Sequence, residues 1–271
     1  MFVVDIVKHK DDMGDSNPLI GFGIGFITDF MDTLGIGSFA PTTLLAKVTK
    51  FIKNDRLLPG TLNIGHTIPV LIEAFLFIQG VKVDGLTLFS LIAAAVAGSL
   101  LGGRIVTKLP EKKIQIVMGL ALFVTALLMA AQKLGYFDIL GAGNEALALT
   151  GVLLIVGIVG NFIFGALMMA GVGLYAPCLA MVSLLGMNPK AAFPIMMGSC
   201  AALMAFGSPK FIKEGLYPRK GTIGVAVGGV LGVVVGYQFI SAISLSKLIW
   251  LIIIVVLITA FDMLRKGFKK S

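Results

Sequence analysis

Residues 35–41 read Gly-Ile-Gly-Ser-Phe-Ala-Pro, and residues 171–177 read Gly-Val-Gly-Leu-Tyr-Ala-Pro, 136 positions later. Upstream, the same offset pairs Gly21 with Gly157, Phe26 with Phe162 and Ile27 with Ile163. Both copies lie inside long apolar segments. Glycine loses much backbone entropy in a helix and proline lacks an N–H, so each copy is predicted to interrupt a helix. The chain therefore contains one duplicated helix break.

The composition places these breaks in a membrane protein. Hydrophobic residues make up 57% of the 271 residues and charged residues only 13%. Several apolar runs exceed the roughly 20 residues that span a bilayer. Residues 1–16 have no apolar core followed by a small-residue cleavage site, so we expect no cleaved signal peptide. We predict an all-α integral membrane protein.

The apolar segments divide the chain into two halves. The first half is expected to contain segments 18–34, 38–50, 59–79, 85–106 and 113–133, and the second half 149–170, 174–187, 191–207, 221–242 and 246–264. The predicted domain organisation is an N-terminal arm at 1–17, a first membrane repeat at 18–133, a linker at 134–148, a second repeat at 149–264 and a tail at 265–271.

The segments that follow the breaks are too short to cross a bilayer, because about 13 residues at 1.5 Å each reach only about 20 Å. Each broken pair is therefore either one interrupted span or a re-entrant hairpin. In the hairpin arrangement, 18 of the 22 Lys and Arg residues lie on one side, and only Lys82, Lys133, Lys190 and Lys247 lie on the other. Interrupted spans would divide the 22 residues into 10 and 12. Positive loops favour the cytoplasm, so the sequence favours a hairpin plus three spans in each half, with both termini cytoplasmic.

An odd number of crossings gives the two halves opposite orientations, which makes them inverted repeats. Positive loops at the cytoplasmic face also account for the net charge of +8, so no nucleic-acid partner is expected. Duplicated breaks at membrane depth are typical of transport sites.

The short helices after the two breaks are predicted to point their N-termini at the membrane midplane, where they form an anion cradle. Pro41 and Pro177 suit the first helical turn, where no N–H is needed. The candidate substrate-binding residues are Gly35, Gly37, Ser38, Pro41, Thr42, Thr43, Gly171, Gly173, Tyr175, Pro177 and Cys178. Other glycines are read as helix-packing positions: Gly98, Gly102, Gly224, Gly228, Gly232 and Gly236.

The duplicated Gly-rich break, with Lys/Arg-rich loops between apolar helices, resembles the TauE/SafE sulfite exporter family of toluene-sulfonate-uptake-type permeases from about residue 18 to residue 265. This resemblance implies secondary transport of a small sulfur-containing anion such as sulfite, a sulfonate or thiosulfate. It places the Gly-rich segments of the family on Gly35, Gly37, Pro41, Gly171, Gly173 and Pro177.

Ionisable residues inside a span are rare and usually functional. Asp29 and Asp32 precede the first break, but the same offset of 136 places Gly165 and Met168 before the second. The expected coupling residues are Asp29, Asp32, Asn63, His66 and Glu73, the last three on one helical face. Three roles are open for the two aspartates. They bind a co-transported proton or cation, they contact an amine on the substrate, or they form hydrogen bonds with backbone groups that the helix break leaves unpaired.

We expect a multi-pass carrier of the inner or plasma membrane that works by alternating access, with a proton as coupling ion. A homodimer is left open. We expect no enzyme activity, cofactor or metal site. Cys178 and Cys200 have no zinc-type spacing, and the methionines form no copper-type series. The alternatives are a cation or soft-metal carrier using Asp29, Asp32 and Glu73, and a non-transporting membrane subunit.

Overall fold

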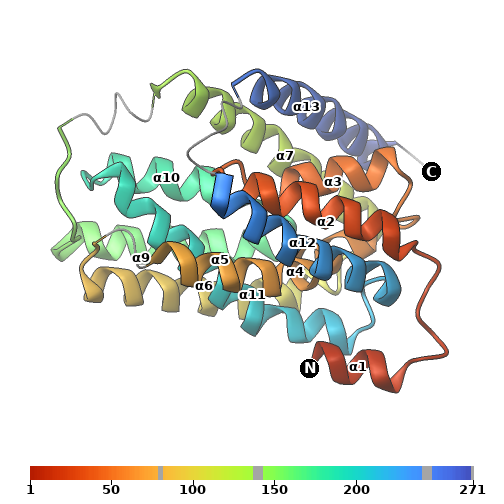
Figure 1. Ribbon diagram of the computed structural model, residues 1–271. Coiled ribbons are helices and arrows are strands. Elements are labelled where there is room, and N and C mark those ends of the chain that lie inside the picture. The colour runs from red at the N-terminus through yellow and green to blue at the C-terminus, as the bar shows by residue number, and fades with distance from the viewer. Residues whose placement is uncertain (79–81, 137–142, 240–245, 270–271) are drawn as a thin grey trace.

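The computed structural model describes residues 1–271 except 79–81, 137–142, 240–245 and 270–271. The described part is a bundle of helices, most of which run roughly along one direction (Figure 1). In chain order, the helices are α1 (Phe2–Lys8), α2 (Pro18–Asp32), α3 (Phe39–Val48), η1 (Asp55–Leu57), α4 (Leu58–Gly65), α5 (Thr67–Ile78), α6 (Gly85–Val106), α7 (Glu111–Lys133), α9 (Gly151–Met168), α10 (Tyr175–Leu184), η2 (Pro189–Ala191), α11 (Ala192–Lys213), α12 (Arg219–Phe239) and α13 (Ser246–Phe268).

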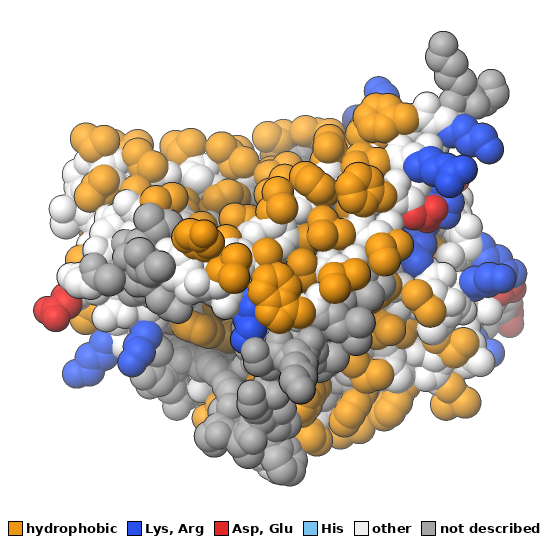
Figure 2. Space-filling model, turned by 90° about the horizontal axis from the view of Figure 1, so that it is seen from above, with side chains coloured by type: hydrophobic (Ala, Val, Ile, Leu, Met, Phe, Trp, Pro, Cys, Tyr) orange, Lys and Arg blue, Asp and Glu red, His pale blue; other side chains and the backbone are white. Residues whose placement is uncertain are grey.

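Within the described residues, five helices are long and apolar enough to cross a membrane: α6, α7, α9, α11 and α12. Figure 2 shows hydrophobic side chains over much of one face, with most of its Lys and Arg side chains gathered toward one end. An all-helical membrane protein is thus confirmed at this level. The middle of the expected linker, the end of the 59–79 segment, residues 240–242 of the 221–242 segment and the last two residues of the tail lie outside the described residues.

The helices follow the duplication seen in the sequence. α10 begins and ends 136 residues after α3, and α9 ends 136 residues after α2. The helix pairs also correspond, because α2 packs along α12 while α9 packs along α6. The contact of α3 with α13 is likewise matched by that of α10 with α7.

Glycine allows the paired helices to approach closely. A Cβ atom at Gly228 would lie 2.1 Å from the Phe22 carbonyl oxygen, and one at Gly98 would lie 1.9 Å from the Phe162 carbonyl oxygen. The same kind of backbone contact occurs at Gly102, Gly224 and Gly232, and Gly236 meets the Thr33 hydroxyl. The packing role predicted for these six glycines is confirmed.

The structure corrects one predicted element, because segment 59–79 is not a single helix. α4 ends at Gly65 and α5 begins at Thr67. Pro69 has no N–H to donate to the Gly65 carbonyl four residues earlier, and a proline ring crowds that carbonyl. His66 lies at the resulting break, so Asn63, His66 and Glu73 do not share one continuous helical face.

Both broken pairs are hairpins whose outer ends lie together. The Ser16 hydroxyl, just before α2, donates to the Phe51 carbonyl, just after α3, at 2.8 Å. In the second half the Asn144 side chain donates to the Ser183 carbonyl in α10 at 2.9 Å, and Ala146 forms a β-bridge with Met187. The chain therefore enters and leaves each break at the same end of the bundle.

The N-terminal arm contains α1, which the apolar-segment pattern did not predict. Asp5 accepts hydrogen bonds from the Tyr217 hydroxyl at 2.5 Å and from Arg219 Nε at 2.8 Å. Burial raises the pKa of Asp5, but its bonds to Tyr217 and Arg219 outweigh this effect and leave the pKa below its usual value.

We predict that acid releases this arm. Because the folded-state pKa of Asp5 is lowered, its ionised form stabilises docking above about pH 4, and this contribution is lost as the pH falls further. Cleavage of the arm by an acid-active protease should increase as the pH falls through that range. Asp5→Asn should be cleaved readily at every pH, and equal protection of the variant and the parent would contradict the prediction.

Candidate functional site

Each hairpin turns with the same backbone motif. In the first, Gly35 N–H bonds the Asp32 carbonyl at 2.8 Å and Ile36 N–H bonds the Met31 carbonyl at 3.3 Å. In the second, Gly171 N–H donates to the Met168 carbonyl at 2.9 Å and Val172 N–H donates to the Leu167 carbonyl at 3.3 Å. This is a Schellman motif, which needs a left-handed residue at its turn, and Gly35 and Gly171 have φ of +79° and +94°. These two glycines therefore end α2 and α9.

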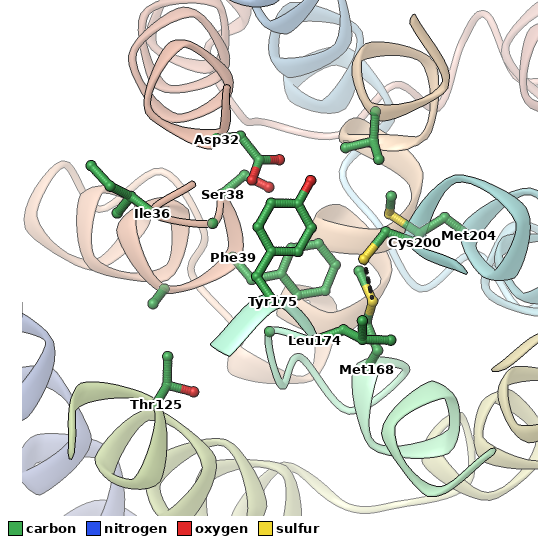
Figure 3. A pocket seen from close by; sticks show the side chains of 14 residues that line it. Asp32, Ile36, Ser38, Phe39, Thr125, Met168, Leu174, Tyr175, Cys200 and Met204 are labelled. Carbon is green, nitrogen blue, oxygen red and sulfur yellow. Dashed lines mark hydrogen bonds between the residues drawn. The ribbon is translucent and has the colours of Figure 1, made fainter. Parts of the chain in front are cut away.

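The two hairpin tips meet at one cavity of about 30 Å³ (Figure 3). Gly37 and Ser38 line it from the first tip, and Gly173 and Tyr175 from the second. A Cβ atom at Gly37 or Gly173 would have no atom within 4 Å, so both glycines keep space open. The volume is enough for about two water molecules.

The residues at the start of α3 and α10 line this cavity. The first intrahelical bonds of α3 and α10 are those of Thr42 N–H to the Ser38 carbonyl and of Cys178 N–H to the Leu174 carbonyl. The preceding N–H groups have no partner within their helices, and proline at positions 41 and 177 has none to donate. Two helix N-termini directed at one space favour an anion.

The polar side chains around the cavity are few. They belong to Asp32, Ser38, Thr125, Tyr175 and Cys200. No Lys or Arg is among its lining residues in the described part of the chain. Figure 3 shows the Asp32 carboxyl group and the Tyr175 hydroxyl directed toward one another. Thr125 lies on α7, and sequence reasoning missed it because one hydroxyl in an apolar helix carries no pattern.

Asp29, His66 and Thr42 form a buried chain of hydrogen bonds beside this cavity. His66 Nδ1 lies 2.9 Å from both carboxylate oxygens of Asp29, and His66 Nε2 lies 2.9 Å from the Thr42 hydroxyl. All three side chains are at most 1% exposed. None of them lines the cavity. The chain joins α2 and the break after α4 to the tip helix α3.

Asn63 and Glu73 occupy different positions. The Asn63 amide donates to the Pro59 carbonyl at 2.8 Å and to the Met168 carbonyl at 3.2 Å, so it satisfies backbone at the second break. Glu73 Oε2 lies 3.5 Å from the Tyr175 hydroxyl, and Glu73 Oε1 is buried without a hydrogen-bond partner. Asn63 thus has a structural contact, whereas Glu73 adjoins a residue that lines the cavity.

The other predicted site residues lie around the tips. Thr43 bonds the Phe39 carbonyl at 2.9 Å within its own helix. Pro177 lines an adjoining apolar groove between α7, α9 and α10, which Gly173 also lines. Cys178 is fully buried, and neither it nor Pro41 lines the cavity. Cys200 does line it, and its Sγ lies 3.6 Å from Met168 Sδ.

The described residues contain no group of three or more His, Cys, Asp or Glu side chains that could hold a metal ion. In the second half, the residue that matches Asp29 is Gly165, and a neutral pair lies one helical turn before it. Asn161 on α9 donates to the Ser199 hydroxyl on α11 at 2.8 Å. The ionisable groups are therefore concentrated at the first tip.

Comparison with known proteins gives a family for the first half. Residues 8–129 match the model of the family described as Sulfite exporter TauE/SafE. Neither the curated proteins nor the solved structures yield a match. The family that the sequence resembled is thus confirmed over these residues, which include the whole first hairpin and most of α7. The match and the apolar helices support a multi-pass membrane protein.

Proposed function

We propose that this chain, whose residues 8–129 match the TauE/SafE family, is a secondary carrier of a small sulfur-containing anion. The observation that carries the proposal is the meeting of both hairpin tips at one cavity. Two sets of backbone donors around a small space suit a compact oxyanion such as sulfite, a sulfonate or thiosulfate. The proposed substrate contacts are those at Gly37, Ser38, Gly173 and Tyr175.

We further propose that the two halves are inverted repeats that alternate access to this site. The helix packing supports this arrangement, because the first helix of each half packs against a helix of the other half: α2 against α12, and α9 against α6. Polar contacts also link the arm and the positively charged loops at one end, as in Lys53 with Asp15 at 3.1 Å and Arg56 with the Thr107 carbonyl at 3.1 Å. The positive-inside rule places this end in the cytoplasm.

The cavity is smaller than the proposed substrate. Room for about two waters does not hold a tetrahedral oxyanion, so the tips must move apart for binding. We infer that this compact arrangement is not the form that binds the substrate. The two hairpins are the elements that move in this scheme.

Flux into proteoliposomes tests the proposal. We predict that Gly173→Leu lowers uptake of labelled sulfite, a sulfonate or thiosulfate by about tenfold or more, because its side chain takes space between the tips. Gly23→Leu is the matched control, since a Cβ atom at Gly23 also meets nothing within 4 Å but lies away from the cavity. Folding of both variants is checked by thermal unfolding in detergent.

Unaltered flux in folded Gly173→Leu would remove the tips from the mechanism. A cation or soft-metal carrier is the second candidate, favoured by Asp32 and Cys200 at the cavity. That function predicts uptake of a monovalent or divalent cation by the purified protein, with no binding of any of the three anions.

A further inference from the structure

Asp32 lies at the first tip in a position that a substrate anion would be expected to take. It is the last residue of α2, is 1% exposed and lines the cavity. Ser38, at the start of α3, brings a hydroxyl and a backbone N–H close to its carboxyl group. Its Oδ1 atom is buried without a partner. Figure 3 shows Asp32 beside Ser38.

The Asp32 carboxylate is therefore an anion of the protein itself that lies at the N-terminus of α3. A helix N-terminus carries roughly half a positive charge, and a carboxylate there forms charge-assisted hydrogen bonds with backbone N–H groups. At the second tip the residue 136 positions later is Met168, which lines the same cavity. The carboxyl group nearest to the start of α10 comes from another helix, since Glu73 on α5 accepts from the Tyr175 hydroxyl at 3.5 Å. The two tips therefore differ in how a carboxyl group reaches them.

The surroundings of Asp32 make a second negative charge costly. Asp29 on the same helix is hydrogen-bonded to His66, which leaves Asp32 without a cationic hydrogen-bond partner in the described residues. Glu73 on α5 brings a second carboxyl group within hydrogen-bonding reach of Asp32. Tyr175 on α10 and Cys200 on α11 complete the titratable groups that face it. An ionised Asp32 would repel an incoming anion across this buried space.

We propose that the ionised Asp32 carboxylate occupies the place of the transported anion at the first tip and so competes with it. When this carboxylate takes up a proton from water, it releases Ser38, which can then bind the substrate. The inference rests on the proposed anion transport and assigns the proton coupling to one residue. A proton and a monoanion then bind together, so that the net charge of the cavity does not change. By linkage, each ligand raises the affinity of the other by the same factor.

Anion binding across a range of pH tests the assignment. A small alkyl sulfonate, such as methanesulfonate, is the probe, because it stays ionised as the pH changes and its own titration does not contribute. Titration calorimetry in buffers of different ionisation enthalpy gives the Kd and the number of protons taken up. For the parent protein we expect one proton, and a Kd that rises by up to about tenfold per pH unit.

Asp32→Asn should bind the sulfonate at every pH with the Kd that the parent shows at low pH, and should take up no proton. Asp262→Asn is the control, because its exposed carboxylate pairs with Lys266 far along α13 and should leave the pH dependence intact. If Asp32→Asn does not fold, Asp32→Ser gives the same readout. Folding is judged by thermal unfolding.

Two results would overturn the inference. If Asp32→Asn keeps the pH dependence of the parent, another group such as Glu73 takes up the proton. If the variant is folded but does not bind the sulfonate at any pH, Asp32 is a direct ligand, as expected for a substrate that carries an amine. Failure of the parent protein to bind any anion at any pH would instead contradict the proposed function.

Discussion

Gly25→Val is expected to separate α2 from α12 and to lower the free energy of unfolding by about 3 kcal/mol. A Cβ atom at Gly25 would lie 2.1 Å from the carbonyl oxygen of Val225. Backbone cannot move aside as a flexible side chain can, so the two helices must shift along much of their length. The effect should be large because α2 and α12 have the most extensive packing between any two helices described here.

Gly23→Val provides the matched control for this prediction. Gly23 lies two residues earlier on the same helix, and a Cβ atom there meets nothing within 4 Å. The change in helix propensity is the same in both variants, and it amounts to less than about 1 kcal/mol. Thermal unfolding in detergent measures both. Equal stability of the two variants would show that the backbone contact is not limiting.

Asp29→Ala is expected to cost about 3 kcal/mol of stability, because it leaves His66 Nδ1 buried without its carboxylate partner. The site is also closed on its other side, since a Cβ atom at Gly229 would lie 2.2 Å from Asp29 Oδ2. Denaturation of the purified protein gives the difference in unfolding free energy.

A double-mutant cycle with His66→Ala isolates the contact between the two side chains. The double variant should be more stable than the sum of the single losses predicts, because no polar partner is then left unpaired. Thr42→Val removes only the outer hydrogen bond to His66 Nε2 and should cost about 1 kcal/mol. Strict additivity of the Asp29 and His66 losses would contradict an interaction between them.

Close backbone contact between helices and one buried chain of hydrogen bonds thus stabilise the bundle. The contrast between Asp29 and Asp32 is important for function. Asp29 is bonded to an imidazole and does not line the cavity, whereas Asp32 lines the cavity with one oxygen atom unpaired. Residues three positions apart on α2 thus have different surroundings, and of the two only Asp32 lines the cavity.

Several features were determined by the sequence alone. Composition predicted a helical membrane protein, and the offset of 136 residues predicted the correspondence of α3 with α10. The repeated Gly-x-Gly predicted both breaks, because the Schellman turn needs a residue without a Cβ atom at Gly35 and Gly171. The kink at His66 could also have been predicted from Pro69, since a missing N–H is a local property.

Only the tertiary structure decided which polar residues share a space. Asp29, Asp32, His66 and Glu73 were all coupling candidates in the sequence, because all are ionisable groups in apolar segments, and Asp32 was preferred to Asp29 only for its nearness to the break. Their surroundings depend on α3, α10 and α12, which are distant in the chain. Hydrogen bonds and close approach are short-range, so they separate a carboxylate paired with His66 from one that lines a cavity only after the two halves have packed together.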